Sequence, residues 1–268
     1  MIFYKTDEEI EKIRKACLLV CDTLAYVGSL MKPGLTGLYL DNQAETFIRD
    51  NGGVPAFKGY RGFPATLCFS PNLTVVHGIP NDREIQEDDV IAVDCGVELD
   101  NYFGDAAYTF ALNGIGSNDA VMKLLSDTKK SLYLAIEQAV HGKRVGDVAF
   151  AVQDYCERQC GYGIVRELTG HGVGRQLHEE PDVPNYGRRG QGPKLLDGMV
   201  IAIEPMINLG KKDIVMLADN WTINTKDGKQ SAHYEHSIAI RKQKADILSD
   251  HIRIEDAIIN NAELTIVP

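Results

Sequence analysis

VIAVD (residues 90–94) and VIAIE (200–204) carry the same pattern, four consecutive apolar residues and then a carboxylate. Apolar residues at successive positions indicate a strand that is covered on both faces. A His-x-x-Pro motif precedes each stretch, HGIP (77–80) in the first case and HEEP (178–181) in the second. We interpret this as an internal duplication that brings two halves of the chain to a central site, with a chance repeat as the alternative.

The residues around each stretch predict a helix pair followed by a β-rich run. Thr6 and Glu9 fit a capping box, and the apolar residues that follow at helical spacing predict a helix that ends before KPG (32–34). We predict further helices over 36–50, 118–141 and 146–160, strands over 65–112 and 163–240, and a hairpin turn at 224–228. No linker interrupts the chain, so we expect one catalytic domain over 1–268, with halves of about 1–115 and 116–245 and a tail over 245–268.

The composition is that of an ordinary globular protein, with 44% hydrophobic and 25% charged residues. The net charge of −10 argues, weakly, against nucleic acid as the main partner. We find no secretory signal and no apolar run of the roughly 18 residues that a membrane span needs, and we expect a cytoplasmic protein. Of the six cysteines, Cys17/Cys21 and Cys156/Cys160 are i, i+4 pairs. A zinc site fits that spacing poorly, and reduced buried thiols fit better.

TGHGVGRQLHEEP (169–181) contains two histidines seven positions apart. His178 and Glu179 look like the start of the zinc-binding HExxH motif, but Asp182 stands where the second histidine should be. The three glycines between Thr169 and Arg175 argue against a helix. His171 and His178 are therefore not a helical zinc pair, and the residues leave their roles open at this point.

Four carboxylates lie in apolar strand sequence, where an unpaired charge is costly. They are Asp94 and Glu204 at the strand ends, Asp105 on the strand that returns after the turn at 100–101, and Glu235 in SAHYEHSIAI (231–240). Any one of them could be exposed or paired with arginine, but few cationic residues lie nearby. Two divalent cations would balance the four charges, and His171 would add one neutral imidazole. Oxygen-rich coordination favours Mn, Fe(II) or Co, and Zn remains open.

The combination of these motifs resembles the type I methionine aminopeptidases. The resemblance rests on FKGYRGFPATLCFSPN (57–72), VVHGIP (75–80), VDCG (93–96), GDAAYTF (104–110), TGHGVGRQLHEEP (169–181), IAIEPMI (201–207) and SAHYEHSIAI (231–240), and it extends to about residue 242. It implies the pita-bread fold, an α+β architecture of two pseudo-symmetric halves with a central antiparallel β-sheet covered by helices. The short separation between His171 and Glu204 leaves no room for the inserted subdomain of the type II enzymes.

The resemblance also implies roles for individual residues. Asp94 would hold one metal ion, Asp105 and Glu235 would bridge two, and His171 and Glu204 would complete the second. His178 would hydrogen-bond the scissile carbonyl, and His77 would contact the peptide nitrogen and assist proton transfer. Glu204 would in addition carry a proton beside the bridging water. We interpret the other histidines as structural residues: His141, His233, His236 and His251.

An apolar pocket for the methionine side chain is implied in the same way. Its lining residues would be Phe57, Tyr60, Phe63, Cys68, Leu177 and Trp221. Taken without the family, the aromatic run at 57–63 favours a packing cluster over a pocket, and the single tryptophan in the nearby β-region shifts that balance a little towards the pocket. Asn72, Thr74 and Ser231 match positions that hold a monovalent cation in relatives.

The implied activity is removal of the N-terminal methionine from newly made proteins whose second residue is small, through a water activated by two metal ions. The free amine requirement makes this an exopeptidase, so a formylated substrate must first be deformylated. We expect a monomer that acts on N-terminal peptides, with ribosome contact as an open question. The alternatives are a prolidase or proline aminopeptidase, and a non-catalytic module that binds peptides.

Overall fold

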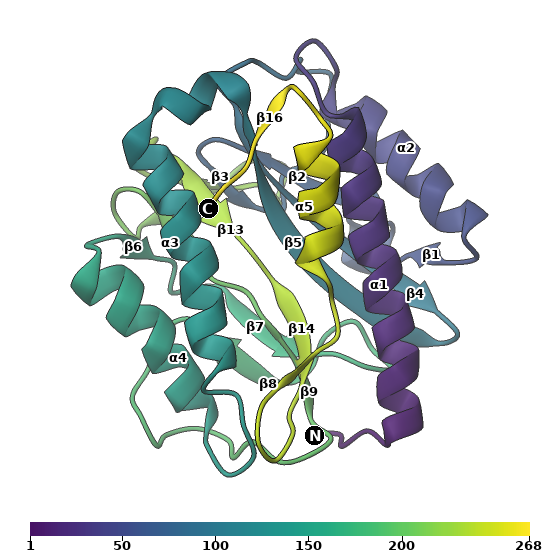
Figure 1. Cartoon of the computed structure of the whole chain (residues 1–268), viewed down its shortest axis with the longest axis vertical. Helices are drawn as coiled ribbons and strands as arrows, with labels where there is room; N and C mark the ends of the chain where they lie inside the picture. Colours follow the sequence, from purple (N-terminus) through teal and green to yellow (C-terminus); the bar gives the residue numbers. More distant parts are fainter.

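The structure of the chain is a computed structural model that describes all 268 residues. Figure 1 shows helices α1, α3, α4 and α5 lying over one face of a β-layer. The helices are α1 (Asp7–Leu30), α2 (Gly37–Asp50), α3 (Asp119–Ile136), α4 (Val145–Gln153) and α5 (His251–Ile259), with 3₁₀ turns at Tyr60–Gly62 and Asn113–Ser117 and a π-helical turn at Asp154–Gln159. No helix has both the length and the apolar character needed to cross a membrane.

The β-layer consists of four hydrogen-bonded sheets rather than one continuous sheet. The first contains β1 (Val54–Pro55), β2 (Leu67–Pro71), β4 (Val90–Leu99), β5 (Tyr102–Leu112) and β16 (Leu264–Thr265). The second contains β7 (Thr169–Gly172), β8 (Glu179–Pro184), β9 (Val200–Ile203), β14 (His236–Ala239) and β15 (Asp246–Ile247). Two small sheets consist of β3 (Thr74–Val76), β11 (Ile214–Met216) and β12 (Ile223–Thr225), and of β6 (Gly163–Ile164), β10 (Met206–Asn208) and β13 (Ser231–His233).

Strand β5 connects the two five-stranded sheets. It pairs with β4 through a turn at Asp100 and Asn101, both of which have positive φ, as a type I′ hairpin requires. The backbone N–H of Glu235 donates to the carbonyl of Ala107, and the Ser237 hydroxyl donates to the carbonyl of Asp105. The start of β14 is thus tied to the middle of β5, and one cluster of 50 buried apolar residues runs from α1 through both sheets.

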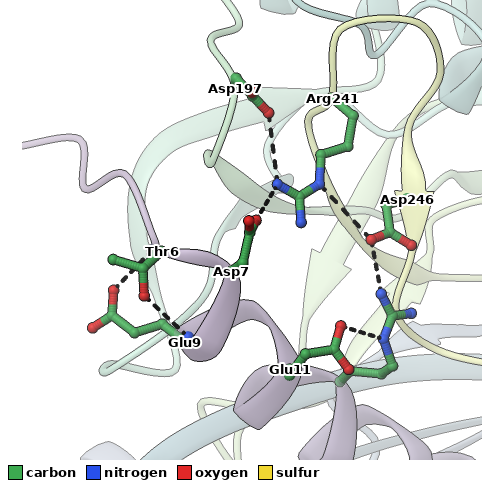
Figure 2. Close-up of polar contacts among 8 residues, drawn as sticks. Thr6, Asp7, Glu9, Glu11, Asp197, Arg241 and Asp246 are labelled. Atoms are coloured by element: carbon green, nitrogen blue, oxygen red, sulfur yellow. Dashed lines mark hydrogen bonds and ion pairs between the residues drawn. The ribbon is translucent and has the colours of Figure 1, made fainter.

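Helix α1 begins at the predicted capping box, because Thr6 Oγ1 accepts from the Glu9 backbone and the Glu9 carboxylate accepts from the Thr6 backbone. Figure 2 shows how this helix end is tied to the segment after β14. The Arg241 guanidinium contacts Asp7 at 2.8 Å, Asp197 at 3.7 Å and Asp246 at 3.9 Å. Because these ion pairs are exposed or half-exposed, we expect them to contribute little each and to act mainly by fixing the segment.

A buried ion pair ties the N-terminal segment to the loop that carries His178. Lys5 Nζ lies 2.6 Å from Glu179 Oε2, and the two side chains are 5% and 3% exposed. The other carboxylate oxygen of Glu179 accepts from the backbone N–H groups of Arg175 and Gln176. The pair therefore organises the turn that immediately precedes His178.

We expect Lys5→Met to lower the free energy of unfolding by about 3 kcal/mol, because it leaves the buried Glu179 carboxylate without its cation. Urea unfolding measures this loss. Lys15→Met, at an exposed position on α1, is the matched control and should change little. A loss below about 1 kcal/mol for Lys5→Met would mean that the pair is dispensable.

Several predicted boundaries were wrong. The helix expected over 118–141 ends at Ile136, because the chain turns back there and Val140 bridges to Arg241. The helix expected over 146–160 changes to a π-helical turn at Asp154. The turn expected at 224–228 exists, but the strands beside it do not form a hairpin, since β12 pairs with β11 and β3. The tail forms α5, which packs on α1, and β16, which pairs with β5.

Candidate functional site

The four predicted carboxylates meet where the two five-stranded sheets join. Asp94 on β4 pairs with Ala107 on β5, so it shares a face with Asp105, two residues away from that partner. Glu204 directly follows β9 and Glu235 directly precedes β14. Because Ile203 pairs with His236, these two carboxylates become neighbours. All four line one cavity.

His171 faces the same cavity from β7. Its Nε2 lies 3.7 Å from Asp105 Oδ2 and 3.7 Å from Glu204 Oε1. Its Nδ1 lies 2.9 Å from the carbonyl oxygen of Gly172, so Nδ1–H donates there and Nε2 presents a lone pair. One possible ligand atom from each of Asp105, His171 and Glu235 lies within 4.8 Å of the others.

These residues fit divalent metal ions. No lysine or arginine forms an ion pair with any of the four carboxylates. One oxygen of Asp94, one of Asp105 and one of Glu235 are buried without a hydrogen-bond partner. Buried unpaired carboxylate oxygens are costly, and a cation that binds them removes that cost. The exposed and arginine-paired alternatives for these acids are therefore excluded.

The charges perturb one another strongly in the metal-free chain. Burial raises the pKa of Asp94 to about 7. Burial and repulsion by neighbouring carboxylates raise the pKa values of Asp105 and Glu235 well above the usual range. Burial also acts to raise the pKa of Glu204, but His233 and His171 outweigh it and hold that pKa below its usual value.

We expect metal binding at pH 7 to release protons, because carboxyl groups with raised pKa values must ionise before they can bind a cation. Calorimetric titration of the chelator-treated protein with Mn²⁺, in buffers of different ionisation enthalpy, counts the protons.

The raised pKa values also predict that the metal-free fold loses stability as pH rises above about 4, because the folded chain holds protons that the unfolded chain has released. A binding enthalpy that does not depend on the buffer would contradict these raised pKa values.

The two histidines of the His-x-x-Pro motifs lie at the edge of the carboxylate cluster. The ring of His178 is 4.2 Å from that of His171, and its Nδ1 lies 2.9 Å from the Tyr60 hydroxyl. Although the residue as a whole is exposed, desolvation of its ring within the cavity and the nearby His171 lower the pKa of His178 to about 4, so the ring is neutral at pH 7. His77 lines the same cavity with a φ of 57°, a conformation that non-glycine residues rarely adopt outside functional sites.

The residues predicted for the methionine pocket form one apolar cluster beside these histidines. Phe57, Phe63, Cys68 and Leu177 are buried, and Tyr60 and Trp221 pack against them. The cavity that this cluster shares with the carboxylates measures about 170 Å³, below the roughly 300 Å³ of most ligand pockets. A larger hollow of about 1000 Å³ lies near Tyr133 and Arg241, away from the carboxylates.

The residues predicted for a monovalent cation also lie close together. The backbone N–H of Ser231 donates to the carbonyl of Asn72, and both Ser231 and Thr74 are buried. The Asn72 side chain is engaged with Asp89 and with the Val90 backbone. A cation at this position would therefore use main-chain carbonyls and hydroxyls rather than the Asn72 amide.

Two further residues lie at the site although sequence analysis assigned them no role there. Arg61 lines the cavity, and no motif pointed to it. His233, which we interpreted as structural, has its Nε2 3.3 Å from Glu204 Oε2. The only signal in the sequence is proximity, because His233 lies two residues before Glu235 but β13 ends at His233 and β14 begins at His236. A third residue, His251 in the C-terminal tail, contacts the backbone of the site. Its Nε2 lies 2.9 Å from the carbonyl oxygen of Glu235.

Comparisons by sequence and by structure both show that this chain is similar to metallopeptidases. A family model described as Metallopeptidase family M24 matches residues 11–242. The methionine aminopeptidase of Clostridium acetobutylicum is 47% identical over 250 residues, covering 93% of this chain and 99% of that protein. The crystal structure of the methionine aminopeptidase from Thermotoga maritima superposes with a TM-score of 0.90 at 38% identity, covering 93% of this chain and 100% of that one. Prolidase from Pyrococcus furiosus superposes with a TM-score of 0.75 at 24% identity, covering 92% of this chain and 65% of that one, and shows a shared fold alone.

Proposed function

The chain belongs to metallopeptidase family M24 and has its pita-bread fold, and on that premise we propose that it removes N-terminal methionine from polypeptides. One observation carries the proposal: the cluster of carboxylates and His171 opens into the same small cavity as the apolar residues around Phe63 and Trp221. The residues that would hold the catalytic metal ions therefore lie next to a pocket that would take one apolar side chain.

Two divalent ions would be held by Asp94, Asp105, His171, Glu204 and Glu235, whose unpaired oxygens and free Nε2 are suitable donors. Mn, Fe(II), Co and Zn are the candidate metals. When bound, such ions polarise the scissile carbonyl and lower the pKa of water.

His178 supplies a directed hydrogen-bond donor in this proposal. When the Tyr60 hydroxyl donates to Nδ1, the single proton of the neutral ring must reside on Nε2. Nε2–H can then donate to the substrate carbonyl oxygen and to the oxyanion that develops there. Glu204, whose pKa is held low, would accept a proton, and His77, which lines the same cavity, would contact the peptide nitrogen and assist proton transfer.

The substrate would bind by its N-terminal residue. The pocket lined by Phe57, Phe63, Cys68 and Trp221, against which Leu177 packs, would take the methionine side chain. The acidic cluster would favour a free amine over a formylated one. A cavity of about 170 Å³ leaves little room beyond that side chain, so we propose that only a small second residue is accepted.

The remaining proposals concern the setting of the reaction. All six cysteines are free, which fits a reducing compartment, and we propose that the chain acts in the cytoplasm on newly made proteins. We also propose that it acts as a monomeric single domain and that Asn72, Thr74 and Ser231 hold a monovalent cation. Contact with the ribosome would bring the substrate to the site.

Hydrolysis of Met-Gly-Met-Met by the Mn²⁺-reconstituted protein tests the function. We expect release of the first methionine only, and none from the N-formylated peptide. An Ala-Pro peptide tests the prolidase-like alternative, and the chelator-treated protein is the control for metal dependence. Cleavage of Ala-Pro in preference to Met-Gly-Met-Met, or no hydrolysis by a protein that has bound metal, would overturn the proposal.

A further inference from the structure

His233 is a buried histidine whose ring faces the acidic cluster. It ends β13, where it pairs with Met206 of β10, and it is 1% exposed. Its Nε2 lies 3.3 Å from Glu204 Oε2, outside hydrogen-bond alignment, and has no other partner. A buried ring nitrogen without a partner is unusual, so the position calls for a role beyond packing.

The Glu204 carboxylate lies between two imidazole rings, and each ring is near a different carboxylate oxygen. His171 Nε2 is 3.7 Å from Oε1, whereas His233 Nε2 is 3.3 Å from Oε2. The terminal torsion of a glutamate is broad and nearly two-fold, so the two oxygens exchange easily unless one of them is held. A donor at Oε2 fixes the carboxylate and leaves Oε1 on the side of His171.

The backbone of His233 is held independently of any ligand. Its N–H donates to Thr109 Oγ1 at 3.0 Å, and the Thr109 hydroxyl donates to its carbonyl oxygen at 2.6 Å. Asp105 lies four residues before Thr109 on β5, and this even spacing places the two side chains on the same face of the strand. The same strand therefore positions Asp105 and the backbone that presents the His233 ring.

We propose that His233 is a positioning residue that donates its Nε2–H to Glu204 Oε2, so that Glu204 binds metal through Oε1. A small rotation about the terminal side-chain torsion of Glu204 brings Oε2 into line with the Nε2–H of His233 and completes this hydrogen bond. Hydrogen bonds to ligating carboxylates orient them and strengthen metal binding. This inference rests on the proposed metal centre and assigns to His233 no contact with the metal itself.

Two variants with a matched control test it by Mn²⁺ affinity, measured calorimetrically on the full chain. We expect His233→Leu to weaken binding by about 10- to 100-fold, and His233→Gln, whose amide can donate from a similar place, to restore most of it. His141→Leu, at an exposed position outside the cavity, should bind Mn²⁺ like the wild type. The visible spectrum of the Co²⁺-loaded protein should change in His233→Leu and return in His233→Gln.

Wild-type affinity and spectrum in His233→Leu would overturn the inference, as would a His233→Gln variant as weak as His233→Leu. If His233→Leu does not fold, ¹⁵N spectra of histidine in the Zn²⁺-loaded wild type decide the question. A protonated Nε2 on His233 supports the donor role, and an unprotonated or metal-bound Nε2 excludes it. Failure of the proposed function differs from both results, because the wild type would then bind no Mn²⁺ or cleave no methionyl peptide.

Discussion

Asp105→Ala is expected to abolish hydrolysis of Met-Gly-Met-Met while the protein stays folded. Asp105 is 3% exposed, it shares a face of the β4–β5 hairpin with Asp94, and one of its oxygens has no protein partner. Removing it would take away one of the proposed metal donors. We expect the metal-free fold to tolerate the change, because burial and neighbouring carboxylates raise the pKa of Asp105 and make its ionised form unfavourable there.

Peptide hydrolysis and thermal unfolding, measured on the same preparation, check both halves of this prediction. Asp105→Asn separates loss of charge from loss of volume and should also be inactive. Asp182→Asn, an exposed carboxylate on β8, is the matched control and should keep wild-type activity. Hydrolysis by Asp105→Ala within about tenfold of the wild type would contradict a mechanism in which two ions share this ligand.

His178→Ala is expected to lower kcat by about 10²- to 10³-fold, the usual effect of losing one oxyanion donor. Its ring is neutral at pH 7, and with the Tyr60 hydroxyl donating to Nδ1, as proposed above, Nε2–H is the group that is lost. We expect Mn²⁺ affinity to change little, because His178 lies beside the carboxylate cluster rather than within it.

Steady-state kinetics with Met-Gly-Met-Met measure the effect. His178→Gln should recover part of kcat, since an amide can donate a hydrogen bond from a similar distance. An unchanged kcat in His178→Ala would remove this residue from the chemistry and leave the oxyanion to the metal ions alone.

Much of the site could be predicted because burial of charge is visible in sequence. VIAVD and VIAIE each place a carboxylate after four apolar strand residues. The expected strand end at Asp94 was wrong, because β4 continues to Leu99, but the structure still brings Asp94 and Glu204 into one cavity. The Asp100–Asn101 turn predicted the hairpin that sets Asp105 against Asp94. The roles of these residues as ligands stay predictions until metal binding is measured.

Other features depend on contacts that local sequence does not specify. The end of α3 at Ile136 follows from the bridge between Val140 and Arg241, about one hundred residues apart. The orientation of the His233 ring depends on Thr109 from a distant strand. The division of the β-layer into four sheets follows from strand pairing such as β12 with β3, which residue alternation within a strand does not encode.

Anomalous diffraction from crystals grown with excess Mn²⁺ tests the central claim most directly, since it locates bound ions without reference to activity. We predict two anomalous peaks within the cavity, contacted by Asp94, Asp105, His171, Glu204 and Glu235. A cavity without ions, or acidic side chains turned away from one another into solvent, would contradict the account.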